Sequence, residues 1–145
     1  MKILILILSI VVLCCEAAAE ERPCTKAEAI EAESSASLLN CWSDIYKSFE
    51  RFRHCDDGAI AEGYSESVVR MLAFHWDQLE ELSKLSSLDR DFFTFVIRHI
   101  DATADKSEIE KVIVNSSTQC PESASAMCSA IEETAKKVLR ELQRY

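Results

Sequence analysis

Glycine and proline are scarce in this chain, and their scarcity narrows the range of folds. Each occurs only twice among the 145 residues. A β-rich fold needs many tight turns, which draw mainly on glycine, proline, asparagine and aspartate. Disordered linkers are also commonly rich in glycine and proline. The composition therefore argues against both, and two glycines are too few for a glycine-rich phosphate-binding loop.

Apolar residues recur instead at helical spacing along most of the chain. Intervals of three or four residues place them on one face of a helix, with charged residues on the opposite face. In the run at residues 92–100, which is also rich in strand-forming residues, the helical period gathers more apolar residues on one face than a strand period would. We therefore predict an all-α fold, a small disulfide-stapled bundle of four to five helices. The predicted helices cover residues 25–53, 64–85, 88–100, 103–117 and 121–143.

Several predicted helices begin at residues that favour an N-cap. Thr25 begins a capping box, because a glutamate follows three residues later and can hydrogen-bond back to the cap. Asp57 follows a turn and is expected to cap the next helical segment, while Asp89 or a serine just before it can cap a later helix. Asp101 or Thr103 is expected to cap the fourth predicted helix.

The N-terminus has the layout of a secretory signal peptide. Lys2 provides a positive start, residues 3–15 are almost entirely apolar, and small residues lead to Ala19 before the first charged pair. The apolar run is too short for a membrane span, which argues against an uncleaved anchor. We expect cleavage near Ala19, so that residues 1–19 are the signal peptide and residues 20–145 form one secreted, extracellular domain. No later stretch predicts stable membrane insertion.

The charge and the motifs of the chain argue against several classes of function. The formal net charge is −9, whereas binding to nucleic acid needs a surplus of lysine and arginine on one face. The sequence contains no nucleophile-elbow motif and no HExxH pair. Its three histidines lack the spacing of zinc ligands. We therefore expect no nucleic-acid partner, no enzymatic activity, and no metal or cofactor.

Five cysteines follow the leader, and behind a signal peptide they are more often disulfide-bonded than metal-bound. If the first predicted helix is continuous, Cys41 and Cys55 lie roughly 20 Å apart, too far for a disulfide. Cys120 and Cys128 would lie roughly 12 Å apart within one helix, unless the chain bends at Cys120. We therefore expect the pairs Cys41–Cys128 and Cys55–Cys120, which tie the first helix to the last. Cys24 is then unpaired, either free or joining two chains in a Cys24-linked dimer.

The triplet Asn115-Ser116-Ser117 is an N-glycosylation sequon. Such a sequon is meaningful only in a secreted eukaryotic protein, where it marks a surface position. We therefore expect Asn115 to lie at the surface near a helix end, as a candidate glycosylation site.

Two classes of function remain. The first is a secreted helical protein without catalytic activity that acts by binding another protein, as a signalling factor, inhibitor or effector does. We favour this class because the apolar stripes are those of an ordinary core, with no surplus of apolar side chains for a cavity. The partner would then be a protein that the sequence does not identify.

The alternative is a carrier that holds a small hydrophobic ligand or lipid in a cavity among its helices. In size, secretion, helicity and cysteine content the predicted protein is similar to saposin-like and insect odorant-binding proteins, although both families arrange their cysteines at other spacings. The partner would then be an apolar small molecule. The side chains expected to line such a cavity are Trp42, Phe74, His75, Trp76, Phe92 and Phe93.

Overall fold

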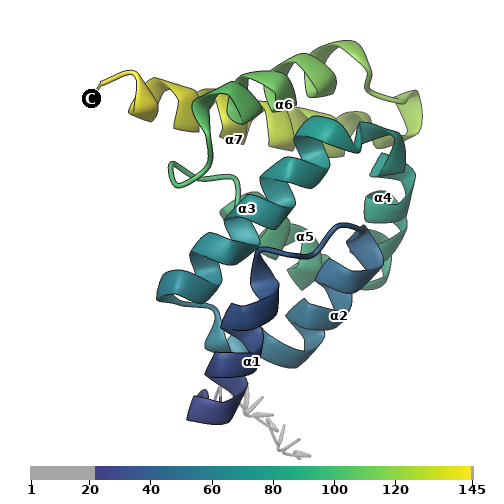
Figure 1. Cartoon of the computed structure of the whole chain (residues 1–145). Coiled ribbons are helices and arrows are strands. Elements are labelled where there is room, and N and C mark those ends of the chain that lie inside the picture. Colours follow the sequence, from purple (N-terminus) through teal and green to yellow (C-terminus); the bar gives the residue numbers. More distant parts are fainter. Residues whose placement is uncertain (1–21, 145) are drawn as a thin grey trace, which may run out of the picture.

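The computed structural model describes residues 22–144, and this part of the chain is helical, with no β-strand (Figure 1). The all-α prediction is confirmed, although these residues form seven α-helices rather than four or five. No helix among the described residues is long and apolar enough to cross a membrane. The predicted signal peptide, residues 1–19, lies outside the described residues. The α-helices are α1 (Lys26–Ala36), α2 (Trp42–Phe52), α3 (Gly58–Phe74), α4 (Leu79–Leu88), α5 (Arg90–Arg98), α6 (Lys106–Thr118) and α7 (Ser125–Leu142).

The first predicted helix ends after Ala36, and the chain resumes as α2. Arg70 on α3 donates from Nη2 to the backbone oxygen of Ser37 at 2.8 Å and to that of Leu39 at 2.9 Å. The carbonyls at the end of α1 therefore find a partner on another helix. α1 and α3 also approach closely, because a Cβ atom at Gly63 would lie only 2.8 Å from the Cβ of Ala36. Position 63 must therefore lack a side chain for the two helices to pack this closely.

The second predicted helix is broken at His75. The residues before the break belong to α3, and those after it form the short 3₁₀ helix η2 (Trp76–Gln78) and then α4. Asn115 on α6 donates from Nδ2 to the backbone oxygens of Leu72, at 2.9 Å, and Ala73, at 3.0 Å. These carbonyls lie in the last turn of α3, so a side chain from α6 satisfies the end of that helix.

The surface position expected for Asn115 is wrong. The residue is only 5% exposed, and its Nδ2 hydrogens are directed at two carbonyls of α3. Its Oδ1 accepts a hydrogen bond from Nε2 of Gln119 at 2.9 Å. A glycan on Nδ2 would replace one donated hydrogen and would need room inside the packed interface. Glycosylation of Asn115 is therefore incompatible with this fold.

The predicted caps are confirmed at three helix starts. Thr25 forms the capping box, in which its Oγ1 accepts from the Glu28 backbone at 3.3 Å and its own N–H donates to the Glu28 carboxylate at 3.1 Å. Asp57 caps α3 and Asp89 caps α5. The fourth predicted helix begins later than expected, because Asp105 is the cap of α6 in place of either residue predicted.

The disulfide pairing expected from the sequence is wrong. The structure joins Cys24 to Cys55, with Cα atoms 4.9 Å apart, and Cys120 to Cys128, with Cα atoms 6.0 Å apart. Cys41 is a free thiol. Neither Cys41–Cys128 nor Cys55–Cys120 forms, and Cys24 is not available to link two chains.

Both predicted disulfide pairs are wrong because the chain turns at places where continuous helices were expected. α1 and α2 form a hairpin, so the 3₁₀ helix η1 (Arg53–Cys55) at the end of α2 returns to Cys24, just before α1. Cys120 precedes the 3₁₀ helix η3 (Glu122–Ala124), and this turn brings it back to Cys128 in the first turns of α7. The disulfide pairing therefore depends on two turns that the spacing of apolar residues does not predict.

The helices are arranged in two parts. α1 to α5 form a bundle, and α6 and α7 pair as a hairpin that lies across one end of α3 (Figure 1). The bundle core is aromatic between α2, α3 and α5: Tyr64 and Phe95 have ring centroids 5.0 Å apart, and both are almost fully buried. The hairpin core is aliphatic, with Ile109 of α6 and Ile131 of α7 fully buried.

Candidate binding cleft

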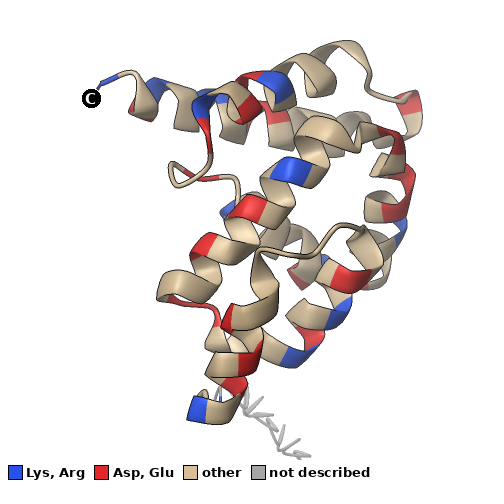
Figure 2. Ribbon diagram, viewed as in Figure 1, with Lys and Arg blue, Asp and Glu red and all other residues tan. Residues whose placement is uncertain are grey.

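The bundle carries an open surface cleft of about 620 Å³. Its walls come from the C-terminal half of α2 with η1, from α5, and from the residue at position 22. Four of the lining side chains are arginines and two are acidic, although the whole chain has a net charge of −9. Figure 2 shows acidic residues spread over most of the ribbon, with several basic residues on α2. The lining residues are Arg22, Phe49, Glu50, Arg51, Arg53, His54, Asp91, Thr94, Phe95 and Arg98.

Two aromatic rings form the base of the cleft. Phe49 of α2 and Phe95 of α5 have ring centroids 5.0 Å apart, and each residue is 3% exposed. The guanidinium carbon of Arg53 lies 5.5 Å from the centroid of the Phe49 ring, a cation–π distance. The base therefore ties α2 to α5 and also orients one of the arginines at the surface.

Two of the arginines have exposed acidic partners. Arg51 makes two hydrogen bonds with Glu31, and the one between Nη2 and Oε2 is 2.7 Å long. Arg53 lies 3.9 Å from Asp91 Oδ2, which is an ion-pair distance too long for a hydrogen bond. The side chains of Glu31 and Asp91 are 50% and 80% exposed. Solvent therefore screens both ion pairs, and within residues 22–144 the Arg53 guanidinium makes no hydrogen bond to a carboxylate.

Arg98 has a buried acidic partner instead. Its Nη2 donates to Asp56 Oδ2, and the Asp56 side chain is only 2% exposed. The same oxygen lies 3.1 Å from Nε2 of His99. A buried carboxylate left without such partners would be strongly destabilising. Arg98 is therefore held in place as part of the cleft wall.

Arg22 and His54 meet at Glu28, beside the disulfide end of the cleft. Nη2 of Arg22 lies 2.7 Å from Glu28 Oε1. The hydrogen bond from the Thr25 hydroxyl and, next in size, the one from Arg22 lower the pKa of Glu28 to about 2. The His54 side chain is 9% exposed, its Nε2 lies 3.5 Å from Glu28 Oε1, and this nitrogen has no hydrogen-bond partner among the described residues. The unsatisfied Nε2 of His54 is thus buried against Glu28 and is not exposed in the cleft.

The same corner does not fit a metal site. Potential ligand atoms of Glu28, His54 and Cys55 lie within 4.8 Å of one another. Cys55 is bonded to Cys24, however, so its sulfur is not the thiolate that metal ions bind. Only one carboxylate and one imidazole remain, fewer than the three protein ligands of a typical zinc site.

A buried group of side chains combines the residue types of a hydrolase triad. His99 Nδ1 lies 3.0 Å from Ser65 Oγ, and His99 Nε2 lies 3.1 Å from Asp56 Oδ2. Ser65 Oγ also donates to Asp101 Oδ2 at 2.7 Å, and Ser65 is 0% exposed. A catalytic nucleophile needs an activating base and an open approach for the substrate. Because Ser65 lies inside α3 without that approach, we interpret the group as a polar network that joins α3 to the end of α5.

The residues expected to line a carrier cavity do not line the cleft, and four of them belong to or pack against the hydrophobic core. Trp42 and Phe92 are buried in the core, at 1% and 0% exposure, whereas Phe74 is 51% exposed. Nζ of Lys111 lies 4.1 Å from the centroid of the Phe74 ring. None of the six expected residues lines the cleft described above. The remaining three are half-buried: His75, Trp76 and Phe93.

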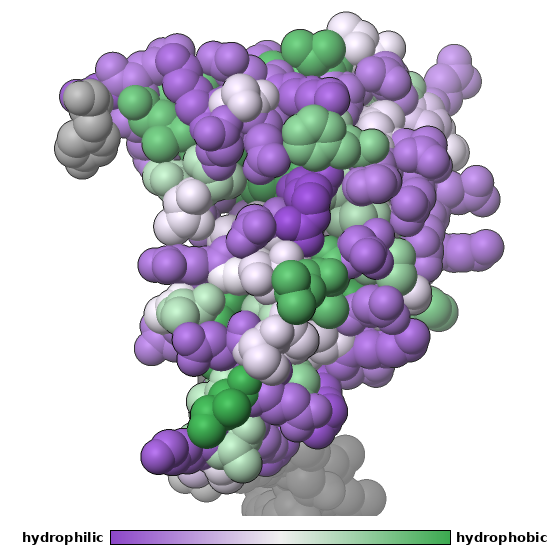
Figure 3. Space-filling view, viewed as in Figure 1, coloured by the Kyte–Doolittle hydropathy of each residue, from purple (hydrophilic) through white to green (hydrophobic). Residues whose placement is uncertain are grey.

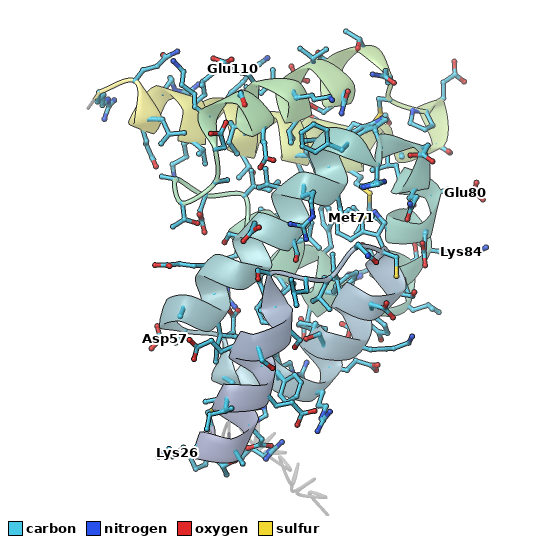
Figure 4. All side chains as sticks on the ribbon, in the orientation of Figure 1. Lys26, Asp57, Met71, Glu80, Lys84 and Glu110 are labelled. Atoms are coloured by element: carbon cyan, nitrogen blue, oxygen red, sulfur yellow. A yellow bond between two sulfur atoms is a disulfide. The ribbon has the colours of Figure 1, made fainter. Side chains whose placement is uncertain are left out.

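A second surface depression, of about 610 Å³, follows α4. Glu80 and Lys84 project outward from this helix (Figure 4), and Leu88 at its end is 79% exposed. The six expected carrier residues are absent from this depression too. Figure 3 shows apolar side chains as separate patches among hydrophilic ones on the face that it displays. Neither depression therefore resembles an enclosed apolar cavity.

The arginine cleft is the feature that the sequence prediction missed. The sequence feature that could have indicated the cleft is the cluster of basic residues at positions 51–54, near the end of a predicted helix in an acidic chain. Nothing in the spacing connects that run with Arg98, which lies 42 residues after its partner Asp56. The cleft becomes visible only when α5 is packed against α2.

Comparisons of the chain with known protein families, with curated proteins and with solved structures find no match. The similarity to saposin-like and odorant-binding proteins in size and cysteine content gains no support from these comparisons. The chemistry of the cleft is therefore the basis on which a function can be assigned.

Proposed function

We propose that this chain is a secreted, non-enzymatic helical protein that acts by binding another protein, and that the cleft between α2 and α5 is its contact site. The observation that carries the proposal is the convergence of four arginines on an open cleft in a chain of net charge −9. Arginine is enriched in protein–protein interfaces and among the residues that contribute most to binding.

The rigidity of the cleft supports this role. The ring pairs Phe49–Phe92, at 5.5 Å, and Phe49–Phe95, at 5.0 Å, hold α2 against α5. The Cys24–Cys55 disulfide holds the segment that carries Arg22 to the end of α2. Binding sites built on packed helices lose less conformational entropy on association than sites on mobile loops.

The secreted character is supported by the two disulfides, because such bonds persist in oxidising compartments. The alternative, a carrier of a small hydrophobic ligand or lipid, has no comparable support. Four of the aromatic residues expected to line its cavity fill or pack against the core, and the fifth, Phe74, is 51% exposed. Protein binding through the cleft is therefore the function that the geometry favours.

Photo-crosslinking tests the proposal. Benzoylphenylalanine placed at Thr94, an exposed residue of the cleft, should give one discrete adduct with a secreted protein from the source organism. The same group at Lys137, an exposed residue on α7, is the matched control and should give none. The adduct partner is then purified, and its affinity is measured by calorimetry for the wild type and for Arg53→Glu, which should bind at least about tenfold more weakly.

Three outcomes would contradict the proposal. Equal crosslinking from both positions would indicate nonspecific contact, and an affinity unaffected by Arg53→Glu would place the contact elsewhere. Recovery of a stoichiometric lipid in native mass spectrometry of the secreted protein would favour the carrier class instead.

A further inference from the structure

We propose that the cleft recognises an acidic peptide segment of the partner, whose carboxylates replace Asp91 and Glu31 as the partners of Arg53 and Arg51. The proposal rests on the proposed function, because it names the chemistry of the partner at the same site. The guanidinium group presents donors in a planar fork that matches a carboxylate. Each of the four arginines in the cleft already faces a carboxylate of this chain, so the site is shaped for that group.

The burial of these partners determines which arginines can change partner. Asp91 is 80% exposed and lies 3.9 Å from Arg53, while Glu31 is 50% exposed. The exposed Arg53–Asp91 pair contributes at most about 1 kcal/mol, so replacing it costs little, whereas the Arg51–Glu31 pair makes two hydrogen bonds and is harder to replace. Asp56 is 2% exposed and stays with Arg98. An incoming carboxylate should therefore engage Arg53 first and Arg51 second.

The mixed charge of the cleft favours a peptide over a sulfated polysaccharide. Glu50 and Asp91 line the cleft beside the arginines, and the net charge of −9 repels a dense polyanion at long range. A segment with a few carboxylates can place them on the arginines and leave the two acids in solvent.

NMR titration of the folded ¹⁵N-labelled protein tests the proposal with defined probes. The acidic probe is a capped pentapeptide with one phenylalanine between two glutamate pairs, and the neutral probe replaces every glutamate by glutamine. The acidic probe should shift amide signals at residues 49–54 and 91–98 and bind at least about tenfold more tightly than the neutral one. Raising sodium chloride from 50 to 300 mM should weaken the acidic complex several-fold.

Three variants make the test specific. Arg53→Glu should weaken binding of the acidic probe at least about tenfold, and Arg53→Gln should cause a smaller loss in the same direction. Arg140→Glu makes the same change in net charge on α7, outside the cleft, and should change the affinity by less than about twofold. Circular dichroism confirms that each variant is folded before it is titrated.

Several results would overturn the inference. These are equal binding of the acidic and neutral probes, no binding of either at millimolar concentration, equal effects of Arg53→Glu and Arg140→Glu, or tighter binding of a heparin hexasaccharide at the same residues. If the Thr94 crosslink still captures a partner protein in that case, the proposed function stands and only the acidic-peptide chemistry fails. If the acidic probe binds as expected but no partner protein is captured, the anion chemistry stands and the proposed function fails.

Discussion

The α1–α5 bundle and the α6–α7 hairpin are held together in different ways. The bundle has an aromatic core and a disulfide between residues separated by 31 positions. The hairpin has an aliphatic core and a disulfide between residues separated by only 8 positions, at its own turn. The bundle is therefore stabilised by long-range constraints, whereas the hairpin is stabilised mainly by a local one.

The difference matters because the cleft lies entirely on the bundle. All its lining residues fall between positions 22 and 98, and the hairpin reaches the bundle mainly through α3 and the Asn115 side chain. The long-range constraints coincide with the part of the molecule that we propose binds a partner. The hairpin is better described as a support that satisfies the end of α3.

Removal of the disulfides should give the largest effect and the sharpest test of this comparison. Replacing Cys24 and Cys55 by serine should lower the free energy of unfolding by about 4 kcal/mol, because the bond closes a long loop. Replacing Cys120 and Cys128 should lower it by about 2.5 kcal/mol. Urea unfolding measures both, with Cys41→Ser as a control expected to change stability by less than about 1 kcal/mol. A larger loss for the hairpin disulfide would reverse the comparison.

Asn115→Ala should weaken the junction between the two parts. It removes the donors to the backbone oxygens of Leu72 and Ala73, and we expect a loss of about 2 kcal/mol. Hydrogen exchange should show faster exchange in α6 and α7, with little change in α2 and α5. Ser117→Ala, on the exposed side of the same helix, is the control. Uniformly faster exchange would mean that the two parts unfold as a single unit.

Ser65→Ala should disturb the polar network within the bundle by about 1 to 2 kcal/mol, since Asp101 Oδ2 and His99 Nδ1 each lose a partner. The change in melting temperature measures this loss. In the native wild type, a fluorophosphonate probe should not label Ser65, because the residue is fully buried. A serine hydrolase treated in parallel is the positive control. Stoichiometric labelling of Ser65 would show that the network is reactive after all.

Thr25→Ala should have the smallest effect on stability, about 1 kcal/mol, because it removes one helix cap. It also removes the largest cause of the lowered pKa of Glu28, so that pKa should rise from about 2 towards 4.5. In the wild type, the contribution of ionised Glu28 is fully present above pH 4.5 and is lost as the pH falls through about 2. NMR titration of the Glu28 carboxyl carbon measures the shift. An unchanged pKa would show that Arg22, not the cap, controls this carboxylate.

The sequence by itself predicted the features that depend on residues close to one another along the chain. The helical period predicts the all-α class, and the N-caps at Thr25, Asp57 and Asp89 are confirmed. These features depend on interactions within about four residues, which a single helical turn contains. For the same reason the sequence does not predict the two breaks, after Ala36 and at His75, that divide the first two predicted helices.

Only the tertiary structure decided the features that join distant residues. Arg70 satisfies the end of α1 from 31 to 33 residues away, and Asn115 satisfies the end of α3 from 42 to 43 residues away. These contacts lie at the two breaks in the predicted helices, and the second of them accompanies the burial of Asn115, the asparagine of the sequon. The cleft has the same origin, because Arg53 and Arg98 share a wall only after α2 and α5 pack around the phenylalanine rings. Local periodicity carries no information about which helix faces lie against each other, and that choice determines where the arginines meet.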